Sequence, residues 1–286
     1  MSATASLAPA RVGRDGALRL RFERRGPATV VAGCRYTLPL QALAPVALDD
    51  PAAVVSILNP TGGLVGGDRL SIDIEVRAGA HALLTTPSAT RVYRTDAEDA
   101  VQSVKISIGP QATVEWVPDH TIPFAGSAFR QTLDVDMDAT ARLILVDAFS
   151  AGRIGRGEAW QFAVLDSAVS VRDQHGWLLC DRLALRGPMT GKAPAWDGLG
   201  YTESHPYFAS IAVMGSFDRE RFTADVRQQC SGVDAGRIGV AALARGGLLI
   251  RCLAPSAPAL IDTIETCWGL GRRALLGLPP LALRKG

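Results

Sequence analysis

The chain has 286 residues, of which 48% are hydrophobic and 20% are charged, and its formal net charge at pH 7 is +2. This composition is typical of a globular protein and excludes a disordered chain. The nearly balanced charge excludes a strongly basic surface, so we expect no nucleic-acid partner and no attachment to an anionic membrane.

Patterns that would direct the chain to a membrane or out of the cell are missing from its sequence. Residues 1–15 lack the apolar core of a signal peptide. The most apolar region, residues 238–253, is interrupted by Arg245 and Arg251 and is too short to span a bilayer. Five scattered cysteines without a C-x-x-C pair indicate reduced thiols. We therefore expect a cytoplasmic protein.

The first two thirds of the chain have the pattern of a β-rich body. Residues 1–16 are expected to form a flexible lead-in, and residues 17–186 contain short alternating segments separated by turn residues. This spacing predicts an all-β sandwich, a barrel or a stack of sheets, although no fixed-length repeat stands out. The predicted strands are residues 18–22, 54–58, 70–76, 81–85, 104–108, 113–117, 129–135, 142–146, 160–164, 169–172 and 178–185.

The last third has a different pattern. Residues 187–200 are rich in Gly and Pro and predict a long connection. Residues 201–286 predict a mixed α/β part packed on the body, so that the whole chain forms one continuous domain. Its expected elements are a strand at 208–213, a helix at 218–230, a hairpin of 240–244 with 248–252, and a final helix capped by Ser256.

A glycine-rich motif, N-P-T-G-G-L-V-G-G-D-R-L, occupies residues 59–70. A phosphate-binding loop needs a Lys after its glycines, whereas Asp68 stands there and would repel a phosphate. A dinucleotide fingerprint opens a helix, whereas residues 70–76 alternate like a strand. The motif instead predicts two tight turns in which glycines supply positive φ. Its residues are Asn59, Pro60, Gly62, Gly63, Gly66, Gly67, Asp68 and Arg69.

Further motifs follow along the chain. They are T-T-P-S-A-T-R-V-Y-R at 85–94, E-W-V-P at 115–118, T-I-P-F at 121–124 and G-R-I-G-R-G-E at 152–158. With the glycine-rich motif, they make residues 17–280 resemble the UreD (UreH) family of urease accessory proteins. The resemblance implies a mainly β fold, with a β-helix-like or stacked-sheet body of many short strands and about two α-helices in the C-terminal third.

The resemblance also implies a function without catalysis, that of a metallochaperone scaffold in urease maturation. Such a protein binds apo-urease and UreF, recruits the GTPase UreG through UreF, and enables nickel insertion into the urease active site. It works in a hetero-oligomer, holds no tightly bound cofactor, and has nickel only in transit. The absence of a nucleotide-binding motif from this sequence agrees with GTP hydrolysis in the partner UreG.

Acidic side chains and one histidine are the candidates for a nickel path. A protein that hands nickel on should bind it weakly, and the sequence has no H-x-H, H-E-x-x-H or C-x-x-C motif of a preformed metal site. Nickel(II) accepts carboxylate, imidazole and water ligands. His120 stands where the family usually has a carboxylate, and it adds a group that titrates near neutral pH. The predicted path residues are Asp68, Asp119, His120, Asp147 and Glu158.

Two other functions are compatible with the same residues. Scattered carboxylates are also found in hydrolases, such as glycoside hydrolases, that need two acids at close range. The low aromatic content of 6% argues against a sugar-binding site. A plain β-rich binding module is the third reading, in which the acidic residues are solvated or pair with the many arginines.

Overall fold

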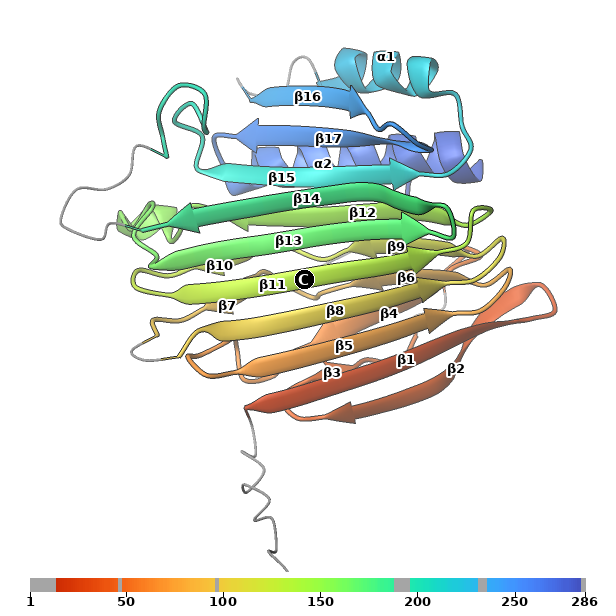
Figure 1. Ribbon diagram of the computed structural model, residues 1–286, viewed down its shortest axis with the longest axis horizontal. Coiled ribbons are helices and arrows are strands. Elements are labelled where there is room, and N and C mark those ends of the chain that lie inside the picture. The colour runs from red at the N-terminus through yellow and green to blue at the C-terminus, as the bar shows by residue number, and fades with distance from the viewer. Residues whose placement is uncertain (1–13, 46–47, 96–97, 188–195, 231–235, 284–286) are drawn as a thin grey trace, which may run out of the picture.

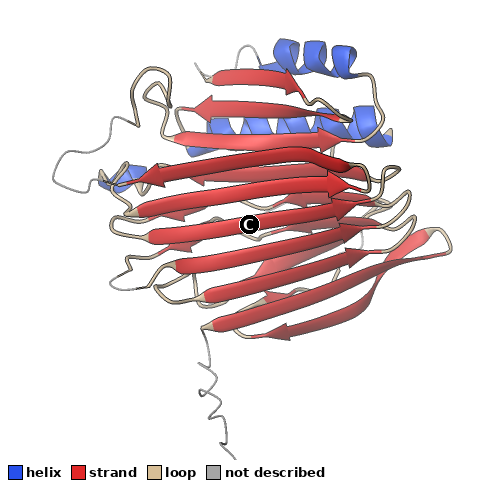
Figure 2. Ribbon diagram, in the orientation of Figure 1, coloured by secondary structure: helices blue, strands red, loops and turns tan. Residues whose placement is uncertain are grey.

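The structure is a computed structural model that describes residues 14–45, 48–95, 98–187, 196–230 and 236–283. Two large sheets face one another, and two α-helices lie at one side of the second sheet (Figures 1 and 2). The first sheet has seven strands in the order β14-β13-β11-β8-β5-β1-β2, and the second sheet runs β16-β17-β15-β12-β9-β6-β4-β3. The mainly β architecture predicted from the sequence is confirmed.

The body is a coil of parallel strands that alternate between the two sheets. The first sheet contains five parallel strands in a row, β1, β5, β8, β11 and β13. The second sheet contains four parallel strands in a row, β4, β6, β9 and β12. Each turn of the chain therefore adds one strand to each sheet, as in a β-helix. The strands of this body are β1 (Asp15–Arg25), β2 (Ala28–Thr37), β3 (Gln41–Ala42), β4 (Ala53–Leu58), β5 (Arg69–Val76), β6 (His81–Thr85), β7 (Thr90–Val92), β8 (Ala100–Ile108), β9 (Thr113–Val117), β10 (Thr121–Pro123), β11 (Ala128–Met137), β12 (Arg142–Ser150), β13 (Val164–Asp173) and β14 (Gly176–Arg186).

The C-terminal part extends the second sheet and covers its outer face. Its elements are β15 (Tyr207–Met214), α1 (Arg219–Cys230), β16 (Arg237–Ala242), β17 (Gly247–Ala254), α2 (Ala257–Gly271) and a π-helical turn (Arg272–Leu276). A short 3-10 turn (Ile154–Arg156) lies earlier in the chain, between β12 and β13. Both predicted helices and the predicted hairpin are confirmed. Ser256 caps α2 by accepting a hydrogen bond from the backbone N–H of Ala259. Most of the predicted connection lies outside the described residues, as does most of the predicted lead-in.

One predicted strand is wrong. Residues 160–163 are not a strand, because Trp160 has a positive φ of 63° and turns the chain. The Trp160 ring instead stacks against Phe208, with ring centroids 6.1 Å apart. Trp160 and Phe162, whose alternation suggested a strand, instead pack into the apolar interior of the coil.

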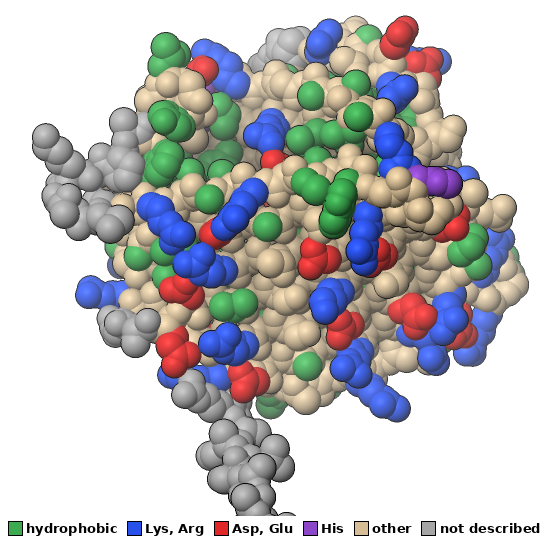
Figure 3. All heavy atoms as spheres, viewed as in Figure 1, with side chains coloured by type: hydrophobic (Ala, Val, Ile, Leu, Met, Phe, Trp, Pro, Cys, Tyr) green, Lys and Arg blue, Asp and Glu red, His purple; other side chains and the backbone are tan. Residues whose placement is uncertain are grey.

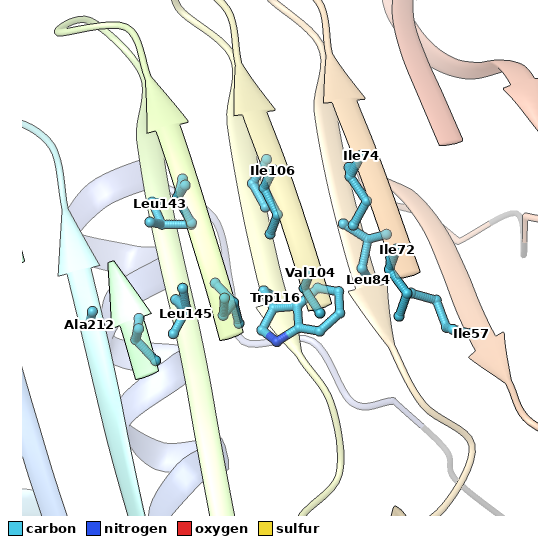
Figure 4. Close-up of a cluster of buried hydrophobic side chains, with 14 of the residues drawn as sticks. Ile57, Ile72, Ile74, Leu84, Val104, Ile106, Trp116, Leu143, Leu145 and Ala212 are labelled. Carbon is cyan, nitrogen blue, oxygen red and sulfur yellow. The ribbon is translucent and has the colours of Figure 1, made fainter. Parts of the chain in front are cut away.

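Apolar side chains from both sheets fill the interior of the coil. Trp116 and Leu84 of the second sheet and Ile72, Val104 and Ile106 of the first point into the same layer (Figure 4). A second apolar cluster lies between the outer face of the second sheet and the two helices. The second sheet is therefore buried on both faces. The opposite face of the first sheet carries interspersed basic and acidic side chains (Figure 3).

A buried ion network fastens α2 to the second sheet. Arg272 and Glu115 are both fully buried, and Arg272 Nη1 lies 2.6 Å from Glu115 Oε1. Arg272 also pairs with Asp50, and the same Glu115 oxygen lies 2.7 Å from Nε2 of His81. The indole N–H of Trp268 donates to the other oxygen of Glu115. One carboxylate thus joins the π-helical turn, α2 and two strands.

We predict that Arg272→Ala will lower the free energy of unfolding by roughly 3–5 kcal/mol, because it removes the guanidinium that two buried carboxylates, Asp50 and Glu115, share. Arg237→Ala is the control, since the Arg237–Glu203 pair is exposed and should contribute under about 1 kcal/mol. Denaturant unfolding of both variants measures the difference. Equal losses in the two variants would contradict a special role for the buried network.

Candidate functional site

The glycine-rich motif forms a compact loop between β4 and β5. The Asn59 side-chain amide donates to the carbonyl of Gly63 over 3.1 Å, and its oxygen accepts from the backbone N–H of Thr61. Gly62 and Gly63 have φ values of 86° and 154°, and a Cβ at Gly63 would lie 2.4 Å from the carbonyl oxygen of Arg91. The predicted tight turns are confirmed, and glycine is required at 63 for a close approach between two backbone segments.

The motif loop borders a cavity of about 140 Å³ inside the coil. Asn59, Gly62 and Gly63 line it from one side, and Thr86 and Pro87 of the T-T-P segment line it from another. Two sequence motifs therefore meet at one internal space. The floor of that space contains Gln102, Gln131 and Asp147.

Asp147 is a carboxylate placed between the two sheets. It projects from β12 into the coil, where protein surrounds it except for the cavities it touches. Ser167 Oγ donates to its Oδ2 over 2.8 Å, and Gln131 Nε2 donates to its Oδ1 over 2.9 Å. Burial raises its pKa to about 6, although both hydrogen bonds favour the ionised form.

The partners of Asp147 form a polar row across the first sheet. Gln102, Gln131 and Ser167 occupy paired positions on the adjacent strands β8, β11 and β13. Gln102 Nε2 donates to Gln131 Oε1 over 3.0 Å, and Gln131 Nε2 also lies 3.1 Å from Ser167 Oγ. Sequence reasoning missed this row. Its signal was Gln131, a polar residue at an inward position between the apolar inward residues Phe129 and Leu133.

Asp147 is shared by the first cavity and a second one of about 470 Å³. The second cavity lies between β14 and the β15–β17 part of the other sheet, and Ser167, Asp181 and Arg251 line it. Arg251 Nη2 and Asp181 Oδ1 are 2.5 Å apart, so an ion pair bridges the two sheets here. Asp147 thus lies in the lining of both cavities.

Asp119 occupies a similar position on the other side of the first cavity. It lines both that cavity and a third one of about 280 Å³, which also contains His120, Glu265 and Trp268. Asp119 Oδ1 accepts from the backbone N–H of His120 over 3.0 Å and lies 3.2 Å from Nδ1 of its ring. The structure therefore brings Asp119 and His120 together, and places Asp119 and Asp147 along one series of cavities.

The two other candidates lie apart from these three cavities. Asp68 is buried in the motif loop, where its Oδ2 accepts from the backbone N–H of Val65 over 2.9 Å, and burial raises its pKa. Glu158 makes a two-pronged pair with Arg153, whose hydrogen bond lowers the pKa of Glu158. Asp68 and Glu158 are absent from the linings of the three cavities. Their predicted contact with nickel remains a prediction.

Within the described part of the chain, no three His, Cys, Asp or Glu side chains converge as a tight metal site requires. Neither helix in these residues is both long and apolar enough to cross a bilayer. The arrangement offers single carboxylates at the junctions of cavities. Single oxygen ligands bind a divalent cation weakly and leave it able to exchange.

We predict that the stability difference between the wild type and Asp147→Asn will depend on pH. The folded-state pKa of Asp147, about 6, lies above the ordinary value of 3.8. The folded protein therefore binds the proton more tightly, and wild-type stability falls as pH rises between these values, by no more than about 3 kcal/mol. Asp147→Asn lacks this loss, so it gains stability relative to the wild type over that window.

Urea unfolding at about pH 4 and about pH 7 tests this prediction. Asp136→Asn is the control, because the hydrogen bond from Arg172 lowers the pKa of Asp136 below its ordinary value of 3.8. The stability that this carboxylate contributes is lost mainly below about pH 4, so the difference between this variant and the wild type should change little between about pH 4 and about pH 7. A pH-independent difference for Asp147→Asn would contradict burial of an ionisable carboxyl.

Comparison with known proteins gives this architecture a family. The family model described as UreD urease accessory protein matches residues 14–285. The chain is 34% identical to a urease accessory protein UreD of Alkalilimnicola ehrlichii, covering 96% of this chain and 92% of the relative. It is 33% identical to that of Delftia acidovorans, covering 92% and 91%, and 34% identical to that of Deinococcus radiodurans, covering 95% of each. The chain belongs to the UreD family of urease accessory proteins.

Proposed function

We propose that this protein is a non-catalytic factor in urease maturation that provides nickel with a path through its own interior. Its partners in the proposal are apo-urease, UreF and the GTPase UreG, which UreF recruits. The UreD relatives supply the link to urease. The named partners and the passage of nickel are our proposals for this chain.

The observation that carries the proposal is the position of Asp147. A carboxylate is costly to place between two sheets, and hydrogen bonds from neutral donors offset only part of that cost. A folded protein that needed only stability would have an apolar residue there. A divalent cation passing through the coil would meet this carboxylate at the junction of two cavities.

The spacing of the acidic groups suits transfer better than storage. Asp119 and Asp147 stand at successive junctions, and each offers one carboxylate to the space around it. Nickel(II) accepts carboxylate, imidazole and water, so it could keep water ligands at each point. His120, in contact with Asp119, would add an imidazole in the third cavity.

The remaining candidates have different roles in this proposal. Asp68 shapes the motif loop that borders the first cavity, and Glu158 holds Arg153 at the end of the coil. Neither side chain lines any of the three cavities. We therefore expect Asp68→Asn and Glu158→Gln to reduce nickel delivery less than Asp147→Asn, unless they also disturb the fold.

The first test is urease co-expressed with its other accessory proteins, with and without this chain. The proposal predicts that both nickel content and urease activity collapse when the chain is left out. Normal loading without it would reopen the hydrolase and binding-module readings. Turnover of a glycoside by the isolated chain would favour the hydrolase.

The path itself is tested by Asp147→Asn in the same co-expression. We predict a several-fold lower nickel content of urease, with the accessory complex still assembled, because the variant keeps the size of the side chain and removes its charge. Asp134→Asn is the matched control. Asp134 also binds a serine, Ser170, but it lies on the exposed outer face of the body.

Two results separate the parts of the proposal. Loss of nickel in Asp147→Asn alone supports an interior path. The other result is that urease is fully loaded with nickel by the Asp147→Asn variant and remains empty when the chain is left out. That result would keep the maturation role and contradict the interior path. Purification of the complex through one tagged component, followed by metal analysis, distinguishes the two.

A further inference from the structure

Two buried cysteines face one another where the helices meet. Cys230 is the last residue of α1, and Cys267 lies in the second half of α2. Their sulfur atoms are 3.8 Å apart. Both side chains belong to the apolar cluster between the second sheet and the helices. Urease maturation, as proposed above, makes no use of them.

The two thiols differ in their surroundings. Cys230 keeps 9% of its surface exposed, whereas Cys267 keeps none. The hydrogen bond between the two sulfurs lowers the pKa of Cys230, and the same bond together with burial raises the pKa of Cys267. The more accessible sulfur is thus also the one that more readily becomes a thiolate, which is the reactive form of cysteine.

A third cysteine completes the cluster without sharing the contact. Cys252 lies in β17, and its sulfur is 3.8 Å from the carbonyl oxygen of Ala209, to which the thiol donates. Burial raises its pKa to about 12, so it is a poor nucleophile. The cysteines outside the cluster, Cys34 and Cys180, lie exposed on β2 and β14.

We propose that Cys230 and Cys267 are a redox modification site that forms a disulfide between α1 and α2 when the protein meets hydrogen peroxide. The Cys230 thiolate attacks one peroxide oxygen and the O–O bond breaks. The departing hydroxide takes up the proton that the Cys230 thiol released, so that Cys230 sulfenic acid and one water form. The Cys267 sulfur then attacks the Cys230 sulfur, the S–O bond breaks, and a second water leaves. Two thiols have lost two electrons to one peroxide.

Little movement is needed for this step. The sulfur atoms must approach from 3.8 Å to about 2.0 Å. The new bond ties α1 to the helix that carries Trp268, a wall of the third cavity. A dithiol reductant returns the two electrons and restores both thiols.

The test treats the folded full-length chain with hydrogen peroxide, blocks the remaining thiols and maps the peptides by mass spectrometry. We expect a linked pair of peptides containing Cys230 and Cys267, which dithiothreitol separates. Cys252→Ser should still form this pair, and Cys230→Ser and Cys267→Ser should not. In Cys267→Ser, a sulfenic-acid probe such as dimedone should label Cys230, because the resolving thiol is gone.

Three results would overturn the proposal. One is recovery of both thiols unoxidised after a treatment that oxidises the exposed Cys34 and Cys180. Another is a bond from Cys230 to Cys252 in place of Cys267. The last is failure of the probe to label Cys230 in a folded Cys267→Ser variant, shown to be folded by its circular dichroism.

Discussion

A carboxylate placed between two sheets is the constraint on which this account depends. Asp147 receives its hydrogen bonds, among the described residues, from Ser167 and Gln131, which carry no charge. Burial therefore raises the pKa of Asp147, and the ionised carboxylate lowers the free energy of unfolding of the body. The surrounding layers of the coil are apolar. A coil with a purely structural role would need no polar row beside its cavities, such as Gln102, Gln131 and Ser167 form here.

The rest of the molecule holds that layer in place. The parallel registers of β8, β11 and β13 set Gln102, Gln131 and Ser167 side by side. Apolar clusters cover both faces of the second sheet. The fully buried Glu115–Arg272 pair fixes α2, whose Trp268 forms a wall of the third cavity. This packing and the ion pair thus hold the elements that border the cavities.

The sequence predicted the kinds of element well and their spatial relations only in part. Alternation identified most strands, and Ser256 marked the start of α2. Alternation failed at Trp160, which has a positive φ and stacks against Phe208, a residue distant in the sequence. The same limit applies to the site. Asp119 and Asp147 were candidates, but their common series of cavities depends on strand registers that no local pattern records.

Plugging the interior gives the most direct test of an internal nickel path. Ser167→Phe would place a large ring beside Asp147, and Ser170→Phe would place the same ring on the outer face of the same strand β13. The measurement is the nickel content of urease matured with each variant, in complexes shown to be assembled. The account predicts nickel-poor urease with Ser167→Phe and normal urease with Ser170→Phe. Equal, normal loading with both would contradict passage through the coil.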